Sequence, residues 1–263
     1  MPLFKIKKVW DFCTYNKAFF ILIFILFLII NFISEYAYNN FSSRWIFIIQ
    51  LFLNIIVTGY GMIITRERIN HGVRLPKIDI MEVFVLGFKS CIVFIIFLFI
   101  QGIILASFSF MFDFPIFDLE ELLFELQQTL ELVYTHDSIY LLTFFVFGGI
   151  LFYVTTFFLE IAVARLADTG SLFRAFNLKS IKRDIDIVGW GNYFKEYTLI
   201  VLALVILYYF KSFNIPISFL DYIVDVFLQL LLFATQFLGI GAIYCRIKDK
   251  NEYLIQLSFN SYK

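Results

Sequence analysis

Six polar side chains inside long apolar segments are the residues of this sequence that could do chemistry. Five are amides and one is a carboxyl. They are Gln50, Asn54, Gln101, Glu160, Gln229 and Gln236. Amides inside a membrane can line a path for a neutral solute, or they can hydrogen-bond one helix to another for about 1 kcal/mol or less each. We expect these amides to link helices.

Glu160 is the only acidic residue within the interior of a predicted span. On a helix that rises about 1.5 Å per residue it lies only about 7 Å from Arg165. We therefore expect Glu160 to pair with this arginine or to extend its carboxyl to the membrane interface, rather than to carry protons. No Asp, Glu, Lys, Arg or His falls near the middle of any predicted span. This argues against proton-coupled transport and against hydrolysis inside the membrane.

Cysteine and histidine, the usual ligands of transition metals, are few. Cys13, Cys91 and Cys245 have no CxxC spacing, and each lies near the same predicted membrane face. This favours free thiols in a reducing compartment over a disulfide framework or a zinc site. His71 and His136 are predicted on opposite faces, and the sequence contains no nucleotide-binding loop or catalytic triad. It therefore predicts no catalytic residue, no cofactor and no metal.

The elements that position these residues must lie in a bilayer. Apolar residues make up 61% of the 263 residues and charged residues only 16%, which places the chain outside the range of soluble globular proteins. A helix that crosses a bilayer needs roughly 20 apolar residues. Six apolar segments have about this length, and they cover residues 18–34, 45–65, 90–112, 139–164, 197–217 and 222–245. We predict an all-α integral membrane protein with about six transmembrane helices, forming a single polytopic domain over residues 1–263.

The fifth segment is the shortest, because its uninterrupted apolar run covers only residues 198–210. The distribution of basic residues indicates that it nevertheless crosses, extended through residues 215–217. Six crossings place 19 of the 21 Lys and Arg on one side of the membrane and 2 on the other. Since basic residues accumulate on the cytoplasmic side, we predict a multi-pass protein of the cell membrane with both termini in the cytoplasm.

The third loop, on the predicted outer side, has the pattern of an amphipathic surface helix. Leucines recur at helical spacing between residues 119 and 133, and the loop contains seven acidic residues but no Lys or Arg. We expect this helix to lie across the outer end of the bundle, with its carboxylates towards water.

The fourth loop, on the predicted cytoplasmic side, has a second amphipathic pattern. Thr169 or Ser171 can cap a helix that starts behind Gly170. The apolar side of this helix consists of Leu172, Ala175, Phe176, Leu178, Ile181, Ile185 and Val188. We expect the helix to lie in the membrane plane, where its basic residues contact anionic lipid headgroups. These residues are Arg174, Lys179, Lys182 and Arg183.

The second and sixth predicted helices end alike, in the sequences GYGMIITR from Gly59 and GIGAIYCR from Gly239. Each reads Gly-x-Gly-x4-Arg, a pattern that favours close helix packing with Arg at the membrane boundary. An internal duplication is the alternative reading.

These two sequences, together with ARLADTGSLFRAF from Ala164, resemble the prokaryotic membrane family known as domain of unknown function 4013. The resemblance covers roughly residues 4–248. It implies a multi-helix integral membrane protein and brings no activity, cofactor or site residue.

Three classes of function remain. We expect a membrane-embedded interaction or assembly component that is not an enzyme, with lipid, a membrane-protein partner or a second copy of the chain as its partner and with no nucleic acid. A transporter or permease component for a neutral or lipid-like solute is the alternative. An intramembrane enzyme is the least supported class, because no nucleophile–base pair can be named.

Overall fold

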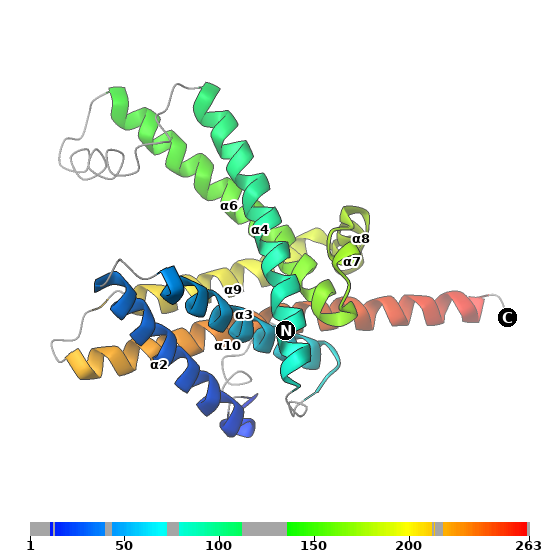
Figure 1. Ribbon diagram of the computed structural model, residues 1–263. Coiled ribbons are helices and arrows are strands. Elements are labelled where there is room, and N and C mark those ends of the chain that lie inside the picture. The colour runs from blue at the N-terminus through cyan, green and yellow to red at the C-terminus, as the bar shows by residue number, and fades with distance from the viewer. Residues whose placement is uncertain are drawn as a thin grey trace. The chain divides into compact units, whose positions relative to one another are not determined.

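The computed structural model describes residues 11–12, 14–39, 44–72, 79–111, 136–211, 213 and 218–261. Within these ranges the chain forms eight helices and no strands (Figure 1). Six helices are long and apolar enough to cross a membrane: α2 (Lys17–Asn39), α3 (Arg44–Ile69), α4 (Ile80–Met111), α6 (His136–Thr169), α9 (Trp190–Lys211) and α10 (Ser218–Ser261). Two short helices, α7 (Leu172–Ala175) and α8 (Leu178–Val188), follow α6. The predicted all-α multi-pass membrane architecture is confirmed.

Several helices extend beyond their apolar runs, because polar residues at their ends are capped or paired. Helix α4 begins ten residues before its predicted start, where the Asp79 carboxylate accepts a hydrogen bond from the Met81 amide at 2.9 Å. Helix α10 continues well past the predicted end at Cys245, as far as Ser261. The predicted surface helix of the third loop lies outside the described residues.

The fifth span begins earlier in the sequence than predicted. Helix α9 starts at Trp190, before the predicted start at residue 197, and is described as far as Lys211, while the predicted continuation through residues 215–217 lies outside the described residues. Its additional N-terminal turns bury the ring of Tyr193, and the ring of Tyr197, where the predicted helix starts, is buried as well. Packing therefore stabilises a stretch that hydropathy alone assigns to the loop. The resulting helix of 22 residues has the length that a full crossing needs.

The described residues form two compact units. Unit 1 comprises Met1–Ile92 and Glu160–Lys263, and unit 2 comprises Val93–Leu159. Unit 1 thus contains α2, α3, the start of α4, the end of α6 and all of α7 to α10. Unit 2 contains the remaining parts of α4 and α6.

The helices of unit 1 alternate in direction, as a multi-pass chain requires. Helix α2 runs antiparallel to α3, since Phe19 near the start of α2 contacts Tyr60 in the second half of α3, with ring centroids 5.1 Å apart. Helices α3 and α10 run parallel, and the Thr65 hydroxyl donates to the Phe237 carbonyl oxygen at 3.0 Å. Both Gly-x-Gly-x4-Arg motifs therefore point towards the same end of the unit.

At both Gly-x-Gly motifs the helices of unit 1 approach one another closely. In α3 the first glycine faces α4 and the second faces α10, because a Cβ on Gly59 would overlap the carbonyl oxygen of Val83 and one on Gly61 would overlap the ring of Phe237. In α10 the first glycine faces α9, and the second, Gly241, faces α3. Each motif therefore allows one helix to contact two neighbours.

Unit 2 is an antiparallel hairpin held by aromatic rings. The rings of Phe108 and Phe147 stack with their centroids 3.9 Å apart and their planes 13° from parallel. One helical turn away, Leu105 lies against Gly148. Since lipid tails are as apolar as these side chains, van der Waals packing is the main attraction in this hairpin.

Candidate functional site

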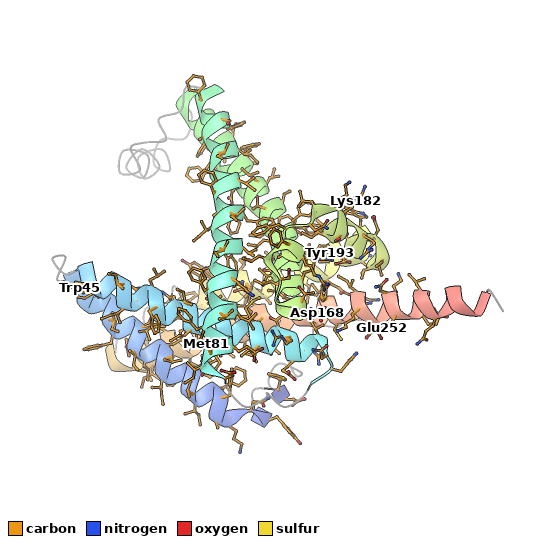
Figure 2. The ribbon with its side chains drawn as sticks, turned by 45° about the vertical axis from the view of Figure 1, so that its right-hand side comes forward. Trp45, Met81, Asp168, Lys182, Tyr193 and Glu252 are labelled. Carbon is orange, nitrogen blue, oxygen red and sulfur yellow. The ribbon has the colours of Figure 1, made fainter. Side chains whose placement is uncertain are left out.

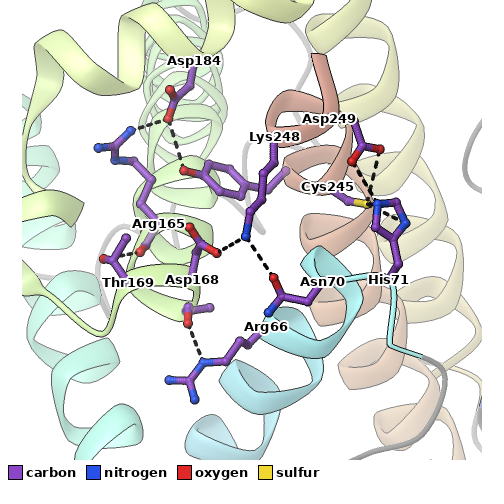
Figure 3. Close-up of polar contacts among 12 residues, drawn as sticks. Arg66, Asn70, His71, Arg165, Asp168, Thr169, Asp184, Cys245, Lys248 and Asp249 are labelled. Atoms are coloured by element: carbon purple, nitrogen blue, oxygen red, sulfur yellow. Dashed lines mark hydrogen bonds and ion pairs between the residues drawn. The ribbon is translucent and has the colours of Figure 1, made fainter. Parts of the chain in front are cut away.

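Polar contacts of unit 1 gather where α3 and α6 end and α9 begins, and we call this region the basic end (Figure 3). It comprises residues 66–72, 79–90, 165–196 and 244–250. Among the described residues, four ion pairs at the basic end each join two helices: Arg66–Glu82, Arg165–Asp184, Arg246–Glu196 and Lys248–Asp168. A fifth polar contact, between His71 and Asp249, joins the end of α3 to α10.

The buried member of this set is the pair between Arg165 and Asp184, whose side chains are only 10% and 7% exposed. The Arg165 guanidinium also donates to the carbonyl oxygen of Arg174 at 2.9 Å, and the Tyr244 hydroxyl donates to Asp184 at 3.5 Å. Burial raises the pKa of the Asp184 carboxyl, and the positive charge of Arg165 opposes this effect. The contacts connect α6, α7, α8 and α10 at one point.

Of the two arrangements expected for Glu160, the pairing with Arg165 is not found, because Arg165 pairs with Asp184. Five residues along a helix correspond to a rotation of about 140° from the starting direction, so the two side chains leave α6 on different sides. The chain folds back after α6 and supplies Asp184 to Arg165 instead. One carboxylate oxygen of Glu160 is buried without a hydrogen-bond partner among the residues that the structure describes.

The fourth loop contains two helices where one was predicted. Gly170, with φ of 65°, turns the chain after α6, and the Thr169 hydroxyl oxygen accepts from the Ser171 amide at 3.3 Å. A second start follows at Asn177, whose side chain accepts from the Ser180 amide at 3.1 Å and caps α8. An N-cap of this kind stabilises a helix by about 1 kcal/mol.

The apolar side of α8 faces the protein and not the bilayer, which corrects the predicted lipid-inserted arrangement. Ile181 and Ile185 are 0% exposed and Val188 is 3% exposed, and α8 packs against α9 and α10. A side chain that the protein covers completely cannot also contact lipid. Phe173 and Leu178 are the large apolar side chains of α7 and α8 that remain exposed.

The predicted basic residues of the fourth loop are all exposed, and Lys182 lies on the outside of α8 (Figure 2). We call these four residues the basic face: Arg174, Lys179, Lys182 and Arg183. Because the opposite side of α8 is fixed by the buried Asp184 and the two isoleucines, three residues of the basic face lie on a helix that the bundle holds in place, and the fourth, Arg174, lies on α7.

Lysine side chains cover the carboxyl ends of α3 and α6. The Lys248 ammonium donates to the side-chain oxygens of Asn70 at 2.9 Å and of Asp168 at 3.0 Å. The Lys89 ammonium donates to the carbonyl oxygen of Gly170 at 2.7 Å. Cations at these positions compensate the carbonyl groups and the partial negative charge that a helix leaves at its C-terminus.

The turn after α3 brings a histidine next to a cysteine and a carboxylate of α10. His71 Nε2 lies 2.9 Å from an Asp249 carboxylate oxygen, and the Cys245 Sγ lies 3.6 Å from both ring nitrogens of His71. The three ligand atoms fall within 4.8 Å of one another. The sequence predicts no such group, because His71 and Cys245 are 174 residues apart. The sequence does indicate one part of the group, because Cys245 and Asp249 are four residues apart and therefore lie on the same side of a helix.

The intramembrane amides fall into different environments. Gln50 donates to the Ser34 hydroxyl at 2.8 Å, which links α3 to α2, and Gln229 accepts from Asn31 at 3.1 Å, which links α10 to α2. Gln236 is half-buried and Asn54 is exposed on the surface of unit 1. In unit 2 the side-chain oxygen of Gln101 is buried without a hydrogen-bond partner among the described residues.

A comparison with protein families identifies the central part of the chain. The model of the family described as "Protein of unknown function (DUF4013)" matches residues 44–215, which include α3 to α9. This region is shorter than the predicted resemblance and leaves α2 and α10, with Cys245 and Asp249, outside the match. No curated protein and no solved structure matches the chain. Since the matched region is more than half of the sequence, this multi-pass membrane protein belongs to the DUF4013 family of proteins of unknown function.

Proposed function

We propose that the protein is a membrane-embedded interaction component without catalytic activity, which binds anionic lipid headgroups through its basic face and thereby assembles at the cytoplasmic surface of the cell membrane. The observation that carries this proposal is the exposure of Arg174, Lys179, Lys182 and Arg183 on helices that the bundle holds in place. Cations on helices that are already folded bind headgroups without the cost of ordering a flexible loop.

The electrostatics support a lipid surface as the partner. The predicted cytoplasmic side has 19 of the 21 basic residues, and each Lys or Arg near an anionic membrane surface contributes about 1 kcal/mol of attraction. Since the apolar side of α8 is already buried in the protein, this attraction does not require α8 to insert. Binding should therefore weaken strongly as the salt concentration rises.

The test is native mass spectrometry of the full chain extracted from vesicles that contain anionic and zwitterionic lipids. The variant Lys179→Glu/Lys182→Glu/Arg183→Glu should retain several-fold less anionic lipid than the wild type. The control Lys17→Glu/Lys195→Glu/Lys250→Glu changes three other exposed lysines and alters the net charge equally. It should retain anionic lipid as the wild type does. Equal losses in the two variants would show that only the overall charge matters, and the proposal would be wrong.

One observation favours the alternative of a transporter component for a neutral or lipid-like solute. A buried amide oxygen without a partner, such as that of Gln101 in unit 2, is a site at which a solute could donate a hydrogen bond. The bonds of Gln50 and Gln229 with α2 use two other amides for contacts between helices. Uptake of a hydroxylated solute by vesicles, abolished by Gln101→Leu, would support transport over the interaction role.

A further inference from the structure

We propose that His71, Cys245 and Asp249 form a binding site for a divalent transition-metal ion, with Zn²⁺ as the preferred ion. The three side chains offer one nitrogen, one sulfur and one oxygen ligand, and they join the end of α3 to α10. This site is separate from the basic face and does not depend on the function proposed above.

The distances between the ligand atoms agree with tetrahedral coordination. With a Zn–S bond of about 2.3 Å and Zn–N and Zn–O bonds of about 2.0–2.1 Å, tetrahedral angles place S and N about 3.6 Å apart and N and O about 3.3 Å apart. The structure has 3.6 Å from Cys245 Sγ to the His71 nitrogens and 2.9 Å from His71 Nε2 to Asp249. The separation of Cys245 Sγ from the second carboxylate oxygen is 4.0 Å. Small side-chain rotations therefore suffice to admit the ion.

The backbone places His71 at a position where most proteins have glycine. The His71 amide bonds back to Arg68 and the Gly72 amide to Glu67, at 3.3 and 2.7 Å. This pair of bonds is the Schellman ending of a helix, in which the residue at C′ adopts the left-handed conformation. His71 has that conformation, with φ of 58°. A residue with a Cβ is disfavoured there by roughly 1–2 kcal/mol relative to glycine.

Two further features are needed to bring the ligands together. Cys245 and Asp249 are four residues apart on α10, so they leave the helix on the same side. The end of α3 is held against this side by Lys248, which bonds Asn70 at 2.9 Å. Lys248 directs its ammonium towards Asn70 and Asp168, so this cation is engaged elsewhere.

The ligand types select the class of ion. A thiolate and an imidazole suit zinc and related transition metals, whereas Mg²⁺ and Ca²⁺ prefer oxygen ligands alone. Binding would release the Cys245 proton to solvent, because the thiolate is the form that binds metal. With three protein ligands, the fourth tetrahedral position would be taken by water from the exposed side, where the His71 side chain is 65% exposed.

The experiment measures zinc binding by the purified full-length chain in detergent, by competition with a chromophoric chelator. Wild type should bind roughly one zinc ion per chain with at least about 100-fold higher affinity than either Cys245→Ser or His71→Asn, since even residues behind metal ligands change affinity 10–100-fold. Asparagine tolerates the left-handed conformation, so His71→Asn should remain folded even if Cys245→Ser does not. Matched controls are Cys91→Ser and His136→Ala, which should bind zinc like wild type.

A second measurement follows the thiol directly. In the background Cys13→Ser/Cys91→Ser, Cys245 is the only cysteine, and zinc should slow its alkylation several-fold whereas Mg²⁺ should not. The same protection should be lost in His71→Asn. Zinc affinity that is equal in wild type and His71→Asn, or alkylation that zinc leaves unchanged, would overturn the proposal and leave a simple His71–Asp249 hydrogen bond.

Discussion

Unit 1 and unit 2 are stabilised by different means, although both consist of apolar helices. At the basic end of unit 1, helices are joined by charges with defined partners, such as Arg165 with Asp184. In the hairpin of unit 2, stacked rings such as those of Phe108 and Phe147 supply the contacts. Charged and hydrogen-bonded groups fix the relative positions of helices, because an unpaired partner is costly. Aromatic packing against lipid-like surroundings discriminates much less between arrangements.

The largest expected effect concerns the buried ion pair. Asp184→Ala leaves the Arg165 guanidinium, which is 10% exposed, without its anion and should destabilise unit 1 by about 3–5 kcal/mol. SDS-induced unfolding in mixed micelles measures the change. The double variant Arg165→Met/Asp184→Leu should recover most of the loss, since apolar residues can replace a buried pair. A loss below about 1 kcal/mol for Asp184→Ala would contradict a role for this pair in holding α8.

Substitution of a glycine by alanine should have opposite effects on stability in the two units. Gly59→Ala places a methyl group on the carbonyl oxygen of Val83, so α3 and α4 must move apart at a cost of about 1–3 kcal/mol. Gly149 in unit 2 has no heavy atom of another segment within 4 Å of its Cβ position. Gly149→Ala should therefore stabilise its helix by roughly 0.5–1 kcal/mol. Parallel unfolding curves of the two variants test the contrast, and a loss of stability in both would refute it.

The stacked rings should contribute less than the buried ion pair and less than the close approach at Gly59. A double-mutant cycle with Phe108→Leu and Phe147→Leu should give a coupling energy of about 0.5–1.5 kcal/mol, which is smaller than the loss of stability expected for Asp184→Ala. The cycle uses the same unfolding assay and removes the contributions that each ring makes to other neighbours. A coupling energy as large as the loss expected for Asp184→Ala would contradict the difference between the two units.

The candidate sites could be predicted only in part. The exposure of Lys179, Lys182 and Arg183 agrees with the amphipathic pattern of α8, because charged side chains rarely become buried. The apolar side of the same helix was predicted to contact the bilayer, but it contacts the protein. The sequence does not decide between the two, since the bilayer and the protein interior are equally apolar environments for Ile181 and Ile185. Hydropathy does not distinguish them.

By itself the sequence determined that the chain crosses a membrane about six times. The length and polarity of an apolar run are local properties, and the bilayer responds to them without reference to the rest of the chain. The close packing at Gly59 and Gly241 was likewise indicated by a local pattern. The tertiary structure alone decided which groups meet, namely Asp184 with Arg165, and His71 with Cys245 and Asp249. It also decided that α9 starts at Trp190, where burial of tyrosine rings stabilises the additional turns. These contacts join residues distant in sequence, and helix packing specifies them where hydropathy does not.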